Sequence, residues 1–346
     1  MVWKTFDPAH WEQRALQYEE VMLDAAVEFE EEFDSWRDLV AVYKDIRDRP
    51  AVRTHFRARG RRFGIWDALA GEAQFTSWAR EVEWFIENGA WAAGSEYLLA
   101  HILNEQFWSS GGEYELDVEE MGQTIGEYRL RHLLEPFWGT SSIKAYGGIP
   151  VYSAAGQTAM HQTPHGRQYH NGTTFAALGA SEDLSASDCT ALCRAAEDFF
   201  LAQQSYRKAG TNELENGANL TVLIRNSTAS HKWRDFSRLA EYRDSSSTTH
   251  SNIFEGMGVR RLSRLDKTKA ELDDDMTVQF ILSNAPPKQR LVGYVDWLDP
   301  FMDAWESKDT GFFRSVTKRG YGVGVVDPGA IFEVRSDAAP PVGPLQ

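Results

Sequence analysis

Residues 320–334 read GYGVGVVDPGAIFEV, a stretch in which glycine alternates with apolar residues before a proline. Glycine-rich loops of the G-x-G-x-x-G type bind a pyrophosphate, but such a loop has to open a helix. Pro328 and the short apolar run behind it exclude a helix at this point. We therefore predict a strand, a turn at residues 327–329 and a second strand over residues 331–334.

Length and composition limit the number of domains and the kind of protein that this chain can form. The chain has 346 residues, of which 42% are hydrophobic, and it is long enough for two or three domains with a substantial core. No apolar run approaches the ~18 residues that cross a bilayer, and the first residues lack the apolar centre of a signal peptide. We expect a soluble protein that is made in a cytoplasm and has no membrane partner.

Charge and cysteine content narrow the class further. The formal net charge of −15 excludes binding of nucleic acid over the whole surface, because phosphates repel a surface of the same sign. Cys189 and Cys193 are the only cysteines, and they lie four residues apart in a predicted helix. Two thiols exclude a disulfide framework, and we predict that both are small core side chains.

A cluster of arginines is a local exception to the acidic composition, in the sequence RTHFRARGRRF at residues 53–63. Its members are Arg53, Arg57, Arg59, Arg61 and Arg62. One interpretation is a set of ion pairs with acidic neighbours in residues 28–32, on the same or another subunit. The other is an electrostatic contact with DNA or with a scaffold partner.

Residues 9–45 carry the pattern of one long amphipathic helix. Apolar residues recur at every third or fourth position, opposite an acidic face. The apolar stripe includes Tyr18, Met22, Phe29, Phe33 and Trp36. No companion helix follows immediately, so we expect this stripe to pack on something beyond its own domain.

A second helix is predicted over residues 118–137, with Pro136 at its end. Gly122 and Gly126 weaken it, because glycine has a low helix propensity. Residues 60–115, before this helix, are irregular and aromatic, and they predict helical pieces with an extended hairpin.

The second half of the chain has a readable order of elements. Helices over residues 187–207 and 228–240 flank a short apolar strand over residues 220–225. Strands follow in GVRRL, TVQFIL and LVGYVDW, then an acidic loop, then the paired closing strands. Helices and strands without regular alternation predict an α+β architecture.

The loop HQTPHGRQYHNG holds the best candidate ligands for a metal, His161, His165 and His170. A metal-dependent hydrolase is therefore one hypothesis. Pro164 and Gly166 disfavour the helix that would turn two of these imidazoles toward one ion, and the loop lacks a glutamate to act as general base. No nucleophile elbow, P-loop or Cys/His pair occurs elsewhere, so we predict no enzyme, no metal and no cofactor.

The order of elements resembles the major capsid proteins of tailed bacteriophages, which have the Hong Kong 97-type fold. In that family a helix, an apolar strand and a second helix lie in the A domain; here they match SASDCTALCRAAEDFFLAQQSYRKAG and NLTVLIRNSTASHKWRDF. A strand with a glycine start follows, here GMGVRRL, and long P-domain strands end in a turn with proline, here RSVTKRGYGVGVVDPGAIFEV. The resemblance covers roughly residues 165–336.

The resemblance implies a division of the whole chain. The expected parts are a largely helical N-terminal arm at 1–60, an E-loop region at 61–116, a first part of the P domain at 117–180, an A domain at 181–300, closing P-domain strands at 301–336 and a flexible tail at 337–346. The spine helix of the P domain would be 118–137, with 87–108 as a rival. The family's lysine crosslink is not expected, because only Lys4 and Lys44 precede this helix.

The resemblance also implies a function. We expect a structural protein that self-assembles into hexamers and pentamers of an icosahedral shell around double-stranded DNA, in a virion that assembles in the host cytoplasm. An acidic lining would contact the DNA only weakly. Scaffolding, portal and decoration proteins are further expected partners. A bacterial nanocompartment shell, of the encapsulin kind, is the alternative with the same fold. The glycines of residues 320–324 would let a long strand bend, or let the backbone of a neighbour approach closely.

Overall fold

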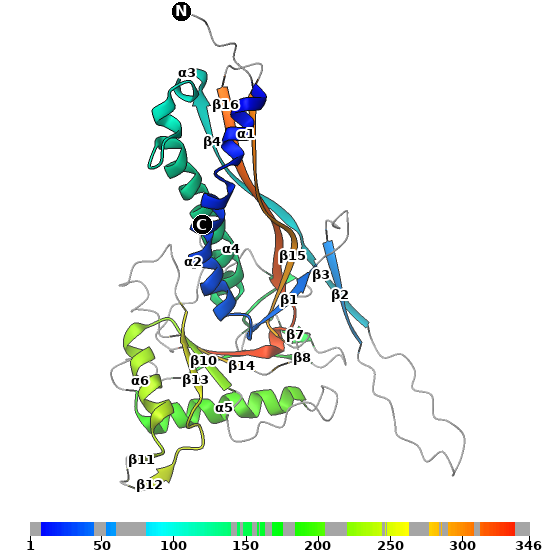
Figure 1. Cartoon of the computed structure of the whole chain (residues 1–346). Helices are drawn as coiled ribbons and strands as arrows, with labels where there is room; N and C mark the ends of the chain where they lie inside the picture. Colours follow the sequence, from blue (N-terminus) through cyan, green and yellow to red (C-terminus); the bar gives the residue numbers. More distant parts are fainter. Residues whose placement is uncertain are drawn as a thin grey trace, which may run out of the picture.

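The structure is a computed structural model of the whole chain. It describes residues 8–44, 53–59, 81–139, 144–145, 148–153, 158, 160–162, 168–175, 184–204, 220–243, 246, 248–262, 277–283, 285, 290–307 and 312–335. These residues form an elongated limb, which joins a second, smaller unit at one end (Figure 1). Within them, no helix is both long enough and apolar enough to cross a bilayer.

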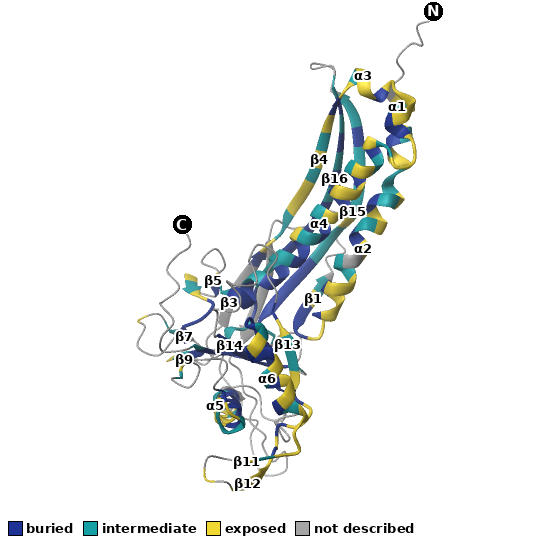
Figure 2. Cartoon of the chain, turned by 90° about the vertical axis from the view of Figure 1, so that its left-hand side faces the viewer, coloured by how far each residue is buried: buried dark blue, intermediate teal, exposed yellow. Residues whose placement is uncertain are grey.

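The limb is a four-stranded sheet with helices along one face. The sheet order is β1 (Val40–Lys44), β15 (Val292–Ser307), β16 (Phe312–Val325) and β4 (Gly89–Leu98). Only β1 is parallel to its neighbour. Helices α1 (Pro8–Leu16), α2 (Glu19–Ser35) and α4 (Glu113–Trp138) follow the long strands, with exposed residues on their outer side (Figure 2). The core of the limb therefore lies between α2, α4 and the sheet.

The smaller unit is a five-stranded sheet with two helices. Its order is β13 (Gly258–Arg261), β10 (Leu220–Ile224), β14 (Val278–Leu282), β17 (Ile331–Arg335) and β9 (Gly172–Thr174). Helices α5 (Ala186–Gln204) and α6 (Ser227–Arg238) pack beside it. Ser185 and Asn226 cap these helices through side-chain oxygens that accept the amides of Asp188 and Ala229.

Short elements complete the described chain. The hairpin of β2 (Arg53–Arg59) and β3 (Glu81–Glu87) projects from the side of the limb (Figure 1). At the far tip of the limb lie α3 (Leu99–Ile102) and the 3-10 turn η1 (Glu105–Trp108). Three small antiparallel pairs are β5 (Lys144–Ala145) with β6 (Ile149–Pro150), β7 (His161–Gln162) with β8 (Gln168–Tyr169), and β11 (Glu241–Arg243) with β12 (Thr249–Ser251).

The opening stretch of sequence connects the two sheets. The glycine-rich residues end β16 in the limb, the 3-10 turn η6 (Pro328–Ala330) follows, and β17 then enters the five-stranded sheet. The predicted strand–turn–strand order is thus confirmed, but the prediction that the two strands pair with each other is wrong. Strand β16 pairs with β15 and β4, whereas β17 pairs with β14 and β9, because the turn sends the chain onward rather than back.

Three other predictions about elements are corrected. The single helix predicted over residues 9–45 is α1 and α2, which turn at Gln17 and Tyr18, followed by β1, whose β-branched residues pair with β15. The rival helix at 87–108 is largely β4, because pairing with β16 overrides its helical pattern. The acidic loop is the second half of β15. The proline in it, Pro300, falls where the register with β16 shifts, so the strand continues past it and spans the boundary expected at residue 300.

Candidate functional site

The apolar stripe of α2 is covered by α4 of the same chain. Met22, Phe33 and Trp36 are buried, and Tyr18 and Phe29 are half-buried. The partner of this stripe thus lies outside the expected arm at 1–60, but within the same chain. The reason is the pair of glycines in α4 that the sequence presented as a weakness.

Gly122 and Gly126 let the two helices approach closely. A Cβ placed on Gly122 would lie 2.3 Å from the carbonyl oxygen of Met22, and one on Gly126 would lie 3.0 Å from Cβ of Phe29. Glycines four residues apart share one helix face, which here is the face against α2. Glycine lowers the helix propensity of α4 at these positions, but its lack of a side chain is what allows this close contact.

Two buried arginines fasten α2 to the rest of the limb. Arg129 of α4 and Arg319 of β16 are each only 5% exposed at the side chain, and both donate hydrogen bonds to the carboxylate of Glu30. Arg129 also donates through Nε to the hydroxyl of Tyr294, at 2.8 Å, and lies 3.6 Å from the ring centroid of Phe33. Helix α2, helix α4 and the sheet therefore share one polar cluster.

The two carboxyl groups near these arginines have pKa values that are shifted in opposite directions. Burial raises the pKa of Glu30, but Arg129 and Arg319 lower it by more, so that its pKa lies below the ordinary value. The same two arginines lie near Asp296, where burial outweighs them and raises the pKa. Glu30 is therefore an ionised carboxylate, and it forms ion pairs with both arginines.

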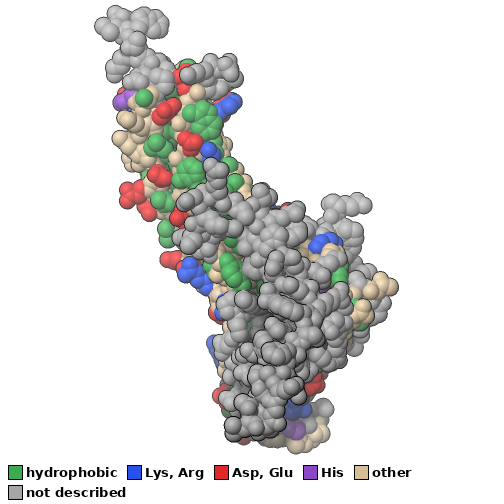
Figure 3. Space-filling model, turned by 90° about the vertical axis from the view of Figure 1, so that its right-hand side faces the viewer, with side chains coloured by type: hydrophobic (Ala, Val, Ile, Leu, Met, Phe, Trp, Pro, Cys, Tyr) green, Lys and Arg blue, Asp and Glu red, His purple; other side chains and the backbone are tan. Residues whose placement is uncertain are grey.

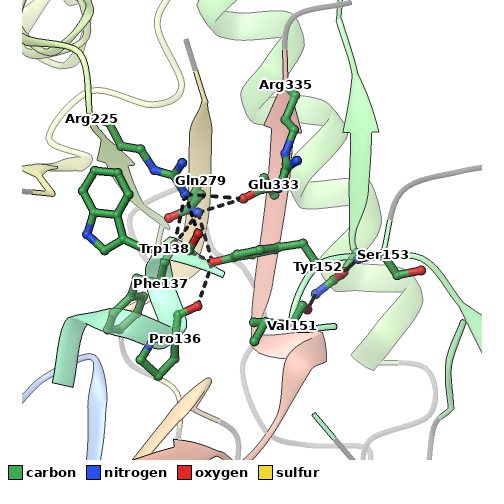
Figure 4. Close-up of polar contacts among 11 residues, drawn as sticks. Pro136, Phe137, Trp138, Val151, Tyr152, Ser153, Arg225, Gln279, Glu333 and Arg335 are labelled. Atoms are coloured by element: carbon green, nitrogen blue, oxygen red, sulfur yellow. Dashed lines mark hydrogen bonds and ion pairs between the residues drawn. The ribbon is translucent and has the colours of Figure 1, made fainter. Parts of the chain in front are cut away.

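A second buried polar network lies where the limb meets the smaller unit (Figure 4). Its acceptors are the last carbonyls of α4, which no residue further along the helix can satisfy. Gln279 donates through Nε2 to the carbonyl of Phe137 at 2.7 Å, and the hydroxyl of Tyr152 donates to the same carbonyl at 2.9 Å. Strand β14 of the smaller unit and the segment after α4 thereby converge on the end of one helix.

The charged members of this network are an arginine and a glutamate that are almost fully buried. Arg225 is 5% and Glu333 is 2% exposed at the side chain, and Nη2 of Arg225 lies 3.8 Å from Oε2 of Glu333. The same Nη2 lies 3.3 Å from the carbonyls of Phe137 and Trp138, so a cation meets the negative end of the α4 dipole. Glu333 also accepts from Gln279 at 2.9 Å and from Arg335 at 2.6 Å.

Backbone geometry completes the junction. Gly139 ends α4 in the left-handed region, with φ of 64°, where glycine is favoured. A Cβ at Gly139 would also lie 2.4 Å from the ring of Tyr152. The ring can therefore lie against the helix end and bring its hydroxyl to the helix carbonyls.

The arginine cluster falls partly on the projecting hairpin. Arg53, Arg57 and Arg59 belong to β2, and their Cα partners across the hairpin are Glu87, Glu83 and Glu81. Arg61 and Arg62 lie outside the described residues. The residues opposite these three arginines in the hairpin are thus glutamates of β3.

Two histidines of the loop with candidate metal ligands have separate roles in the structure. His161 is buried, Nε2 lies 3.1 Å from the carbonyl oxygen of Val151, and burial lowers the pKa of this imidazole to about 4. His170 bonds through Nδ1 to the hydroxyl of Ser153, at 2.8 Å. His165 lies outside the described residues, and among those described no group of three side chains could hold a metal ion.

The two cysteines are core residues, as predicted. Cys189 and Cys193 are buried in α5, and burial raises the pKa of both thiols, that of Cys189 to about 12. Neither thiol is positioned to react with a reagent in solution.

Acidic residues line the helical side of the limb. Helix α2 contains no basic residue, and its exposed positions include Glu20, Asp24, Glu31 and Asp34. Helix α4 adds exposed Glu119 and Glu120. Figure 3, which views the molecule from the side opposite to that of Figure 2, also shows acidic side chains along the limb.

Comparison with known proteins places this architecture. No protein-family model matches the chain, and no curated protein matches it in sequence. A structure of Mycobacterium phage Patience matches with a TM-score of 0.52 at 9% identity, covering 97% of this chain and 89% of the other. The mature capsid of bacteriophage PhiM1 matches with a TM-score of 0.50 at 10% identity, covering 88% and 87%. The chain has the Hong Kong 97-type capsid fold.

The predicted fold class is thereby confirmed. The sequence analysis did not find the buried polar network between the limb and the smaller unit. A signal for it was present, because Arg225, Gln279 and Glu333 each interrupt or end a short run of apolar strand residues. A charged or amide residue within a buried strand has to find a partner in the core. Which partner it finds depends on the crossing of two distant segments, and spacing does not reveal that.

Proposed function

We propose that this chain is a major capsid protein, a structural protein that assembles into hexamers and pentamers of an icosahedral shell around double-stranded DNA. The observation that carries the proposal is the fold over nearly the whole chain: a long helix on a long bent sheet, a projecting hairpin and a smaller α/β unit at one end. In this proposal α4 is the spine helix, the hairpin β2–β3 belongs to the E-loop, and the five-stranded unit belongs to the A domain.

The charge of the limb supports an enclosed nucleic acid that is held loosely. A shell has to contain densely packed DNA without binding it tightly, and carboxylates repel phosphates. The acidic residues of α2 and α4 would provide such a surface if this side of the limb faced the interior. That the helical side of the limb faces the interior of the shell is part of the proposal.

The first test is the state of assembly of the purified protein. We expect closed polyhedral particles, or rings of five and six subunits, in negative-stain electron microscopy, and a matching size in light scattering. Nucleic acid that is extracted from particles after external nuclease treatment would identify a genome shell. Particles that enclose a protein instead would identify a nanocompartment shell. A monomer or dimer under every condition would refute both.

The arginines of residues 53–62 provide a second test. We propose that they form a contact between subunits or with DNA, and such a contact weakens as salt screens the charges. Replacing Arg53, Arg57, Arg59, Arg61 and Arg62 with glutamine should shift assembly, followed by light scattering, to a higher protein concentration and flatten its salt dependence. As a matched control, Arg234 and Arg238 on α6 can be replaced in the same way. Unchanged assembly and salt dependence would show that the cluster makes no such contact.

A further inference from the structure

One isoleucine at the base of the hairpin is buried against the long sheet. Ile86, near the end of β3, is 1% exposed and packs with Val295, Val326 and Tyr43. Asn88 alone separates β3 from β4, so the chain passes from the hairpin into the sheet at this point. Ile86 is therefore a hairpin residue that lies close to the point where the chain enters the limb.

The surface beneath Ile86 consists of glycines from the two central strands. A Cβ placed on Gly324 would lie 2.9 Å from Cγ1 of Ile86, and one on Gly293 would lie 2.8 Å from Cδ1. A Cβ on Gly322 would lie 3.0 Å from Cγ2 of Ile86 and 2.6 Å from the carbonyl oxygen of Glu87. These three glycines, Gly293, Gly322 and Gly324, form a slot that Ile86 fills.

The glycines of the slot provide space rather than an unusual backbone conformation. Gly111, Gly148 and Gly256 have positive φ and no atom near a placed Cβ, whereas the slot glycines are extended strand residues with neighbours at contact distance. Close approach of another segment is one of the recognised reasons for glycine within a strand. The dense alternation at residues 320–324 is thus explained in part by the hairpin that crosses it.

We propose that Ile86 is a positioning residue, which is seated in the slot of Gly293, Gly322 and Gly324 and fixes the direction in which the β2–β3 hairpin leaves the limb. Among the strands of the limb, β16 is the one that β3 contacts most. The seat belongs to the isolated subunit. Its consequence for a shell, namely where the hairpin reaches a neighbouring subunit, rests on the proposed function.

A double-mutant comparison of Ile86 and Gly324 tests whether Ile86 is held by the slot. The three atoms nearest to a Cβ on Gly324 belong to Ile86, and in Ile86→Ala the nearest one left would be Cβ of residue 86, at an ordinary 3.6 Å. Gly324→Ala should therefore disturb the hairpin in the native background and add nothing in the Ile86→Ala background. Gly320→Ala is the matched control, because a Cβ there meets Trp297 and Leu298 instead. Its effect should be the same in both backgrounds.

Hydrogen exchange and a spin-label distance provide the readouts on the isolated full-length subunit. We expect amides of residues 53–59 and 81–85 to exchange about tenfold faster in Ile86→Ala and in Gly324→Ala. Cysteines introduced by Ala58→Cys and Glu120→Cys can carry the labels, since both native thiols are buried. The distance distribution between them should shift or broaden in both variants, whereas any shift caused by Gly320→Ala should be the same with and without Ile86.

The outcomes separate the seat from general packing and from the proposed function. Ile86→Val, which removes one methylene, should give an intermediate exchange rate and serves if Gly324→Ala does not fold. Native distance distributions in Ile86→Ala and Gly324→Ala, even with lowered thermal stability, would overturn the proposal. A subunit that never assembles would refute the shell function, yet the distances would still decide whether Ile86 positions the hairpin.

Discussion

Replacing Glu333 with glutamine should lower the free energy of unfolding of the isolated subunit by about 3 kcal/mol, because the change leaves a buried cation without its counter-charge. Glutamine keeps the shape of the side chain, so the loss reports the charge rather than a cavity. Arg225 would remain almost fully buried, and Gln279 would face a second amide instead of a carboxylate. Urea unfolding followed by far-UV circular dichroism measures the loss.

The control for this prediction is the second arginine on the same glutamate. Arg335 also bonds Glu333, but its side chain is 27% exposed, so water can replace the bond. Arg335→Gln should cost less than about 1 kcal/mol. Equal losses in Glu333→Gln and Arg335→Gln would show that burial of the Arg225 pair has no special weight, and the junction would then be held by apolar packing.

Strong local signals explain why much of the fold could be predicted. Helix α6 was predicted within two residues at each end, because Asn226 caps it and its apolar residues recur with helical spacing. Strand β10, with five buried residues in succession, was equally clear. In both cases the residues that decide the structure are neighbours in the sequence.

Predictions were wrong where distant segments decide the structure. Residues 40–44 continued the helical pattern of the arm, yet they pair with β15, some 250 residues away. The sequence predicts that the closing strands pair with each other, because nothing in DPGA shows that its turn leads into a second sheet. The site residues follow the same rule. The stripe of α2 was found, whereas its covering surface, the glycine face of α4, was interpreted as a weak helix.

Replacing Gly122 with alanine should lower the free energy of unfolding by about 2 kcal/mol, although alanine favours a helix over glycine by about 1 kcal/mol. The sign is the informative part. A Cβ at this position would lie 2.3 Å from a backbone oxygen of α2, and a backbone atom cannot rotate away as a side chain does. Helix α2 would have to move off α4, which also weakens the contact of Glu30 with Arg129.

The neighbouring residue provides a matched control, because Gln123 is exposed on the same helix. Gln123→Ala should change the free energy of unfolding by less than about 0.5 kcal/mol. Hydrogen exchange should show faster exchange in α2 for Gly122→Ala only, since the clash lies between these two helices. If Gly122→Ala is instead more stable than the native chain, α2 does not lie against this face of α4 in solution. The apolar stripe of α2 would then be available to another subunit.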